Sequence, residues 1–247
     1  MRFRLALKTM DTKTKDQLLE LFDSASYTLG FSSLEQRPMS LMDTEASVAL
    51  MPYLMAQKEL ELNRFVPVLL QWLGSYHGLL NPTKLLKMCQ MVEAMAGVDL
   101  PVLRLVSFFL KKTDPRRFKN FTVTPLASPF YFEPRLKELV DSKLRREGFY
   151  KDLPSEVGLM VSASAFKNRE SNLLPEQAFL KRNEQLRTRL VHGVNYRSDA
   201  VLLLRDNSSM SAKEVADTLA LSYEPAHRLT LDVRRYLELG FSLEAAV

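Results

Sequence analysis

Apolar residues recur at steps of three and four along most of this chain, and this spacing predicts a mainly α-helical protein. Over residues 14–30 the repeat is carried by Leu18, Phe22 and Ala25, and Gly30 stands where a helix would end. The same spacing predicts further N-terminal helices over residues 43–62, 63–78, 82–97 and 101–112. Helices joined by such short connections form a bundle or an orthogonal array around one core.

Local start signals mark two of these helices. Asp43 or Thr44 offers the short polar side chain that caps a helix N-terminus. Asn81 followed by Pro82 combines such a cap with a proline that suits the first helical turn. We expect the many methionines of the N-terminal domain to fill irregular gaps in the core, because their side chains are long and flexible.

The middle of the chain has a different composition, and it separates the predicted domains. Residues 118–132 contain several aromatic and β-branched residues with two prolines, which favours a short strand or an extended linker. A helix is expected from Pro134 to Gly148, and residues 150–176 read as a connector. The predicted domains are a helical domain, a basic connecting region and a C-terminal domain, over residues 1–112, 113–175 and 176–247.

The C-terminal domain is predicted to begin with one helix over residues 176–192. Its apolar positions, Leu190 among them, are expected to face inward. The outer side would carry three arginines, Arg182, Arg187 and Arg189. A short apolar helix over residues 200–204, capped by residues 197–199, is expected to follow.

The strongest local signal in the chain lies at Ser211. Together with Glu214 it matches a capping box, in which each side chain accepts a hydrogen bond from a backbone N–H at the helix start. A turn at residues 221–223 then leads to a longer helix that begins at Glu224 and Pro225 and ends at Gly240. A short helix, a capped helix, a turn and a longer helix are the elements of a helix-turn-helix unit.

The stretch RSDAVLLLRDNSSMSAKEVADTLALSYEPAHRLTLDVRRYLELGF resembles the winged-helix DNA-binding core of small bacterial repressors of the ArsR and MarR type. It is also similar to a family of uncharacterised bacterial proteins that place such a core after a helical N-terminal region. Those proteins precede the core with a motif echoed here by residues 172–174 and 192–194. Only residues 241–247 follow the last helix, too few for a β-hairpin, so the wing is expected to be absent or vestigial.

This resemblance implies a DNA-binding transcriptional regulator, with the last helix as its recognition helix. Arg228 is the better candidate for reading a base, while Arg234 and Arg235 suit phosphates. The residues expected to contact DNA are Ser211, Lys213, Tyr223, His227, Arg228, Arg234 and Arg235. The alternative interpretation is that Arg234 and Arg235 pair with Glu238 or Asp232 on a solvated helix face.

Net charge adds a second candidate region. The chain carries a formal charge of +5, and residues 104–151 contain 12 basic against 5 acidic side chains. Residues 180–247, by contrast, contain 10 basic and 9 acidic side chains and are nearly neutral. A phosphate-contact patch is therefore expected at Lys111, Lys112, Arg116, Arg117 and Lys119, unless this run is simply a solvated face.

Little in the sequence favours an enzyme. The three histidines and the single cysteine, Cys89, have no metal-ligand spacing, and no phosphate-binding loop or nucleophile motif occurs. Cys89 lies on an apolar helix face and is expected to be a buried thiol. Because no metal-ligand or phosphate-binding motif occurs, we expect no cofactor and no metal. No signal peptide or membrane span is recognisable, so we expect a cytoplasmic protein.

The function predicted from sequence is thus DNA-binding transcription regulation by an all-α protein with a C-terminal helix-turn-helix. Double-stranded DNA is the expected partner, and the N-terminal domain would support a homodimer or bind a protein partner. The competing hypothesis is a non-enzymatic interaction or scaffold protein that retains the winged-helix-like fold without binding DNA.

Overall fold

The structure is a computed structural model that describes residues 14–32, 42–57, 60, 62–96, 100–122, 157 and 172–239. Over these ranges the regular elements are helices, so the predicted mainly α fold is confirmed. The β contact recorded within them is an isolated antiparallel bridge between Phe31 and Leu173. None of the helices in these ranges is long and apolar enough to cross a membrane.

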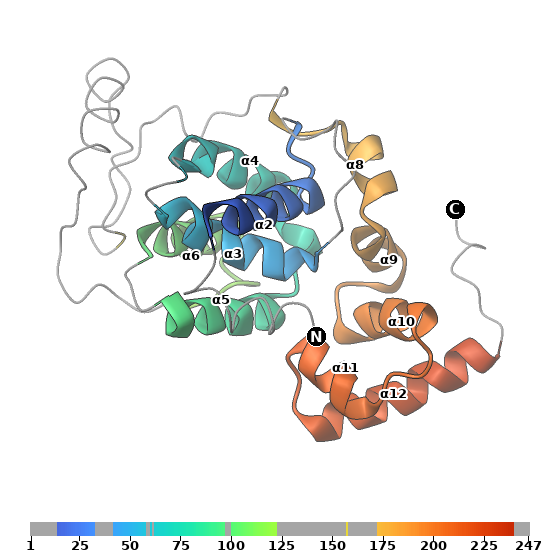
Figure 1. Cartoon of the computed structure of the whole chain (residues 1–247). Helices are drawn as coiled ribbons and strands as arrows, with labels where there is room; N and C mark the ends of the chain where they lie inside the picture. The colour runs from blue at the N-terminus through green and yellow to red at the C-terminus, as the bar shows by residue number, and fades with distance from the viewer. Residues whose placement is uncertain are drawn as a thin grey trace, which may run out of the picture.

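Among its described residues, the N-terminal part contains five α-helices and two 3-10 helices, which Figure 1 shows packed around α3. They are α2 (Lys15–Thr28), α3 (Thr44–Ala56), η4 (Leu62–Phe65), α4 (Val66–Tyr76), η5 (His77–Leu79), α5 (Pro82–Ala96) and α6 (Pro101–Thr113). The C-terminal part contains α8 (Glu176–Arg182), α9 (Glu184–His192), α10 (Tyr196–Asp206), α11 (Ala212–Leu219) and α12 (Tyr223–Glu238).

Three of the helix starts that carry a polar cap are those expected from sequence. The Asp43 carboxylate accepts a hydrogen bond from the Ala46 backbone N–H at 3.0 Å and so caps α3. The Asn81 side-chain oxygen accepts from the Lys84 N–H at 3.2 Å at the start of α5. The capping box of Ser211 and Glu214 is present at the start of α11. Each cap satisfies backbone donors that have no partner within the helix.

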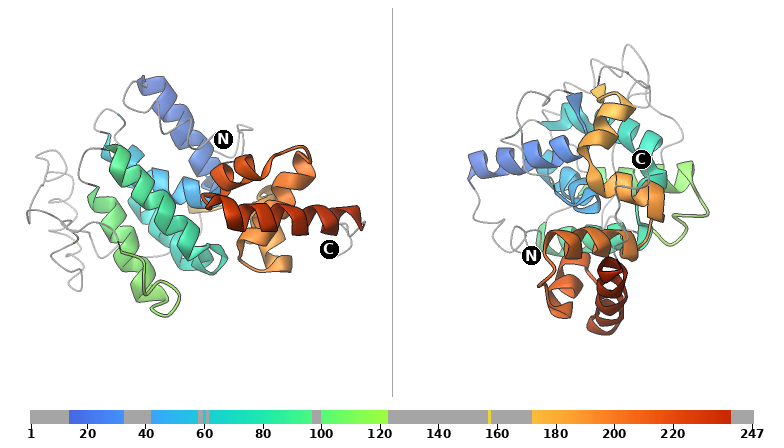
Figure 2. Two further views of the ribbon diagram at one scale, coloured as in Figure 1. Left: turned by 90° about the horizontal axis from the view of Figure 1, so that it is seen from below. Right: turned by 90° about the vertical axis from the view of Figure 1, so that its right-hand side faces the viewer.

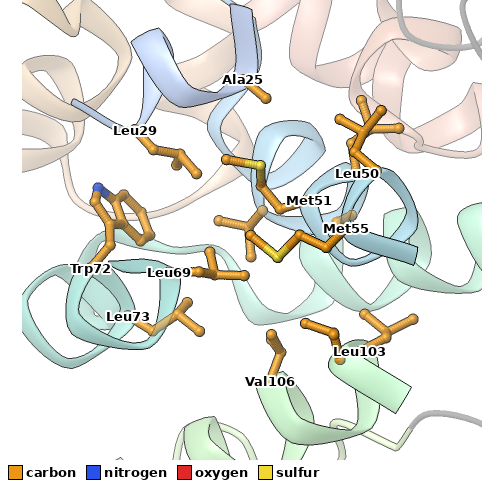
Figure 3. Packing of buried hydrophobic residues seen from close by; sticks show 14 of the residues in the cluster. Ala25, Leu29, Leu50, Met51, Met55, Leu69, Trp72, Leu73, Leu103 and Val106 are labelled. Carbon is orange, nitrogen blue, oxygen red and sulfur yellow. The ribbon is translucent and has the colours of Figure 1, made fainter. Parts of the chain in front are cut away.

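A large apolar core is enclosed by α2 to α6 together with α8 and α9. Its centre is α3, whose residues from Thr44 to Met55 are all buried. Met51 reaches toward Ala25 and Leu29, and Met55 reaches toward Leu69 (Figure 3). These methionines occupy gaps between helices, as predicted for the core methionines of this chain. Cys89 is fully buried in the same core, also as predicted.

A second, small core lies between α10, α11 and α12. Its buried members are Ala200, Val201, Leu204, Val215, Ala216, Leu219, Ala226 and Val233. The three helices form a separate body at one end of the molecule, visible in both views of Figure 2. Phe179 and Leu186 pack in the larger core instead, so the second core begins well after residue 176, where the C-terminal domain was predicted to start.

The prediction of one helix over residues 176–192 is wrong. The helix is interrupted at Asn183, whose backbone is extended and whose side chain caps α9 by accepting from the Leu186 N–H. The side-chain amide of Asn183 also donates to the Thr28 carbonyl oxygen at 3.0 Å. A long-range hydrogen bond of this kind cannot be anticipated from local periodicity.

The predicted sides of α9 and the start of α10 also need correction. Arg189, expected to be exposed, is 1% exposed, whereas Leu190, expected to face inward, is 56% exposed. The short apolar helix begins earlier than expected, since Asn195 caps α10 and Asp199 is buried within it. Arg189 can be buried because its guanidinium pairs with buried carboxylates from other helices.

Several predicted features fall outside the described residues. They are the helix from Pro134 to Gly148, most of the extended stretch over residues 118–132, and the segment 241–247 where a wing was judged absent. Of the extended stretch, residues 118–120 lie in a turn and Phe121 is buried.

Candidate nucleic-acid interface and a buried charge network

The connection between α11 and α12 is a three-residue turn, Ala220 to Ser222. Ala220 adopts a left-handed conformation with φ of 55° and ends α11. Its carbonyl oxygen accepts a hydrogen bond from the Lys87 ammonium of α5 at 2.9 Å. The turn is therefore set by local backbone geometry and is also fastened to the N-terminal part.

The outer side of α12 is uncovered by other described helices. Viewed from below, α12 is the element nearest the viewer and runs in full view (Figure 2, left). Its inner side buries Ala226, Thr230 and Val233. Residues at three- and four-residue steps from one another share a helix face, so Arg228, Leu231 and Arg235 form one outward row.

The first turn of α12 carries two ring systems and one exposed ion pair. The Tyr223 and His227 rings stack with centroids 5.7 Å apart, and Tyr223 is 58% exposed. Arg228 donates to the Glu224 carboxylate at 2.9 Å, with both side chains mostly exposed. Pairs of this kind contribute about 0–1 kcal/mol, so the guanidinium can leave Glu224 at small cost.

Arg234 and Arg235 lie in different surroundings. The Arg234 guanidinium donates to the carbonyl oxygens of Met210 and Ser208, at 2.8 and 3.2 Å, and so ties α12 to the segment before α11. Arg235 is exposed on the outward row. Asp232, one of the predicted acidic partners, pairs instead with Arg197 at 3.0 Å. The structure thus gives Arg234 a structural contact and leaves Arg235 at the surface.

The start of α11 presents two of the predicted DNA contacts. The Ser211 hydroxyl accepts from the Glu214 N–H, and the Ser211 N–H donates to the Glu214 carboxylate at 2.7 Å. The hydrogen bond from the Ser211 backbone lowers the pKa of Glu214. Lys213 is exposed beside this cap. Ser211 is therefore engaged in capping, and Lys213 is the residue here whose charge faces solvent.

The predicted basic patch at the end of α6 is partly incorporated into the larger core. Phe118 is buried among the cations, and the Arg117 guanidinium donates to the Leu80 carbonyl oxygen at 2.7 Å. Lys111 is half-buried. The cations exposed at this end are Lys112, Arg116 and Lys119.

A network of buried charges, which the sequence did not reveal, joins the two parts of the molecule. Arg189 of α9 forms two-pronged contacts with Glu45 of α3, at 2.6 and 2.8 Å, and with Asp199 of α10, at 2.9 and 2.8 Å. Arg189 also donates to the Leu79 carbonyl oxygen at 2.9 Å. The planar guanidinium suits this arrangement because its donors match carboxylates in pairs.

Lys84 of α5 completes the network. Its ammonium lies 2.5 Å from Asp43, 2.6 Å from Asp199 and 3.5 Å from Glu45, and its side chain is fully buried. The Gln185 amide donates to Asp43 at 2.9 Å and to Asp199 at 3.2 Å. Two cations and three carboxylates are thus held together with polar groups filling the remaining hydrogen-bond sites, which is what buried charges require.

The network shifts the pKa values of its members in opposite directions. Burial raises the pKa of Glu45, against the attraction of Arg189 and Lys84. Burial would also raise the pKa of Asp199, but Lys84 and Arg189 outweigh it and lower that pKa to about 2. Burial alone would lower the pKa of Lys84, yet the carboxylates around it raise the pKa above its ordinary value. The pKa shifts of Asp199 and Lys84 thus favour their charged forms, whereas that of Glu45 opposes its charged form.

The three carboxylates form the one cluster with metal-ligand geometry among the described residues, since their oxygens lie within 4.8 Å of one another. The cation at the centre of that cluster is the Lys84 ammonium, which contacts all three. A divalent ion and this ammonium would compete for the same oxygens. The cluster therefore reads as a structural ion network.

Cys89 offers no reactive thiol. Burial, with a smaller contribution from Glu93, raises the pKa of Cys89 well above its usual range. A thiol in that state is protonated at neutral pH and is a poor nucleophile or metal ligand.

Comparison of the chain with protein-family models, with curated proteins and with solved structures finds no match. The resemblance to winged-helix repressors therefore rests on the local sequence pattern of residues 172–247.

Proposed function

We propose that this protein binds double-stranded DNA through α12, as a transcription regulator, with α11, the turn and α12 acting as a helix-turn-helix unit. The observation that carries the proposal is the uncovered outer row of α12, where Arg228 and Arg235 flank Leu231. Two supporting helices, α10 and α11, which share a core with α12 and join it through a three-residue turn, are the arrangement that presents a helix to the major groove.

The residues of the interface have distinct roles in this proposal. Arg228 reads a base edge after leaving Glu224, because an arginine can donate two hydrogen bonds to guanine. Arg235 and Lys213, both exposed, contact phosphates. Tyr223 and His227 contact the DNA at the start of α12, where the stacked rings are exposed or half-buried. Arg234 supports the interface by fixing α12 against Met210.

The exposed cations at the end of α6 supply a further phosphate contact in this proposal. Lys112, Arg116 and Lys119 combine a local excess of charge with exposure, whereas Arg117 is committed to the Leu80 carbonyl oxygen. Non-specific DNA affinity comes mainly from such cations, and the nearly neutral C-terminal part does not supply it alone.

The proposal is tested by selecting duplexes from a randomised pool with the full-length chain and measuring affinity by fluorescence anisotropy at several salt concentrations. Affinity should fall steeply with salt. Arg235→Gln should weaken binding similarly on all duplexes and reduce the salt slope by about one. Arg228→Ala should mainly reduce the preference for the selected sequence, by roughly 1–3 kcal/mol.

Lys181→Gln is a matched control for these variants, because Lys181 is an exposed cation on α8, outside the three-helix unit. It should leave affinity and salt slope unchanged. Failure to recover any duplex near physiological salt, or equal effects of Lys181→Gln and Arg235→Gln, contradicts the proposal. Because helix-turn-helix units read paired half-sites as dimers, two chains per selected duplex are expected.

A specific observation also favours the second candidate, a protein-interaction module without DNA binding. The large apolar side chains that are exposed among the described residues lie on α9 and on α12 or its C-cap: Leu190, Val191, Tyr223, Leu231 and Leu239. The end of α9 contacts α12 through the His192 and Tyr236 rings, with centroids 6.3 Å apart. Exposed apolar residues that form one contiguous patch mark a protein interface. This candidate predicts no retention of DNA, and loss of a co-purifying protein when Leu190 is replaced by Ser.

A further inference from the structure

Leu231 is the unusual residue of the outward row of α12. It is 54% exposed and is one of the large apolar side chains that reach the surface of the described residues. Neighbours on a helix surface are three and four residues away, and for Leu231 these are His227, Arg228, Arg234 and Arg235. All four are basic. Arg228 and Arg235 are exposed and flank Leu231 on the outward row, whereas the Arg234 guanidinium donates to the carbonyl oxygens of Met210 and Ser208.

These basic neighbours limit which kind of partner can cover Leu231. A partner that fits must supply negative charge on both sides of a small apolar group. The major groove does this, since phosphates line its edges and the thymine C5-methyl projects into it beside the base edge that an arginine reads. A protein surface with an apolar pocket would have to bury Arg228 and Arg235 against it, at a desolvation cost.

We infer that Leu231 is a specificity-determining residue that contacts a thymine methyl group, next to the base read by Arg228. The inference rests on the proposed DNA binding by α12 and names a chemical feature of the target. Leu231 lies about one helical turn after Arg228 on α12. The expected target is therefore a duplex in which a thymine lies close to the base contacted by Arg228. Leu231 then adds apolar contact area that no hydrogen-bonding residue of the row provides.

The experiment replaces each thymine of the selected duplex, one at a time, by deoxyuridine, which lacks only the C5-methyl group. With the wild-type chain, at least one replacement should lower affinity by roughly four-fold, the effect of one buried methyl-sized group. With Leu231→Ala the same replacement should have no effect. Leu239→Ala is the matched control, because Leu239 is another exposed leucine at the end of α12, and it should retain the dependence on the methyl group.

The outcomes separate the inference from the proposed function. If DNA is bound through Arg228 and Arg235 but no thymine methyl matters, the inference is overturned and the proposed function stands. The inference is also overturned if deoxyuridine replacement still lowers the affinity of Leu231→Ala. If no duplex is selected, both fail. The scan with the wild-type chain needs no variant, so it remains decisive if Leu231→Ala folds poorly, which circular dichroism reports.

Discussion

Two arginine–glutamate pairs in this protein have the same chemistry and opposite settings. Arg189 and Glu45 meet at 2.6 Å with both side chains fully buried. Arg228 and Glu224 meet at 2.9 Å with 77% and 69% of their side chains exposed. Removing one partner of the buried pair leaves the other charge without a partner and without water. When the exposed pair separates, water solvates both groups at almost no cost in free energy. The buried pair therefore stabilises the packing of α9 against α3, and the exposed pair leaves its arginine available for a ligand.

The same contrast separates the two bodies of the molecule. The larger core is extensive and encloses α3, while the core of α10 to α12 contains few buried residues and is held to the rest by polar contacts. Those contacts include Lys84 with Asp199 and Lys87 with the Ala220 carbonyl oxygen. We expect the three-helix unit of α10 to α12 to be less stable than the body around the larger core.

The largest effect is expected from removing the buried arginine. Arg189→Met leaves Glu45 and Asp199 without their main partner, and the free energy of unfolding should fall by about 3–5 kcal/mol. Urea denaturation followed by circular dichroism measures it. Arg205→Met is the control, since Arg205 pairs with Glu184 and Asp206 at the surface, and it should cost no more than about 1 kcal/mol. Equal losses would remove the contrast between buried and exposed pairs.

The next effect tests whether the two cores unfold separately. Leu204→Ala should destabilise α10 to α12 by roughly 2–5 kcal/mol. Trp72, the single tryptophan, lies in the larger core, so its fluorescence transition should stay near the wild-type midpoint. Amide hydrogen exchange in α11 should accelerate. Leu103→Ala in the larger core should instead shift the Trp72 transition, and a common shift in both variants would mean that the cores unfold together.

A smaller effect depends on pH. The folded pKa of Asp199, about 2, lies below the unfolded value of about 3.9. Its contribution, roughly 2 kcal/mol, is therefore present above pH 4 and is lost as the pH falls toward 2. Asp199→Asn should be less stable than wild type at neutral pH, and this gap should narrow over that range. The comparison with the variant is needed because the raised pKa of Glu45 acts with the opposite sign.

The pH prediction is checked by urea midpoints of both proteins between pH 7 and the lowest pH at which both fold. A gap that stays constant down to pH 2 would show that Asp199 is not the titrating group.

The smallest effect tests a single cap. Ser211→Ala removes the side-chain acceptor of the capping box and should cost about 1 kcal/mol in urea denaturation. Ser222→Ala is a matched control, because Ser222 precedes α12 at the equivalent position but its side chain makes no capping hydrogen bond. It should be close to neutral. If both serines matter equally, helix propensity rather than capping explains the result.

Much of the secondary structure was readable because its causes are local. The caps at Asp43, Asn81 and Ser211 each act on backbone donors two or three residues away, so a short stretch of sequence contains the whole interaction. Burial of Cys89 was readable too, since periodicity places it on an apolar face. The break at Asn183 was missed because the hydrogen bond of Asn183 to Thr28 spans 155 positions.

The candidate site divides in the same way. The outward row of Arg228, Leu231 and Arg235 follows from helical spacing once α12 is recognised. The commitment of Arg234 to Met210, and of Arg117 to Leu80, does not follow from spacing, because each acceptor is a backbone carbonyl on another segment. From the sequence alone, Arg234 could therefore not be distinguished from Arg235, nor Arg117 from Arg116.

By itself the sequence determined the helical class, the main helix starts and the face of α12 that is free of apolar packing, because these depend on neighbours within a turn or two of helix. Only the tertiary structure decided that Arg189 is buried, that Lys84 occupies the centre of three carboxylates, and that the small core begins at α10. Glu45 and Arg189 are 144 positions apart, and a charged residue is interior only where folding delivers its partners to the same place.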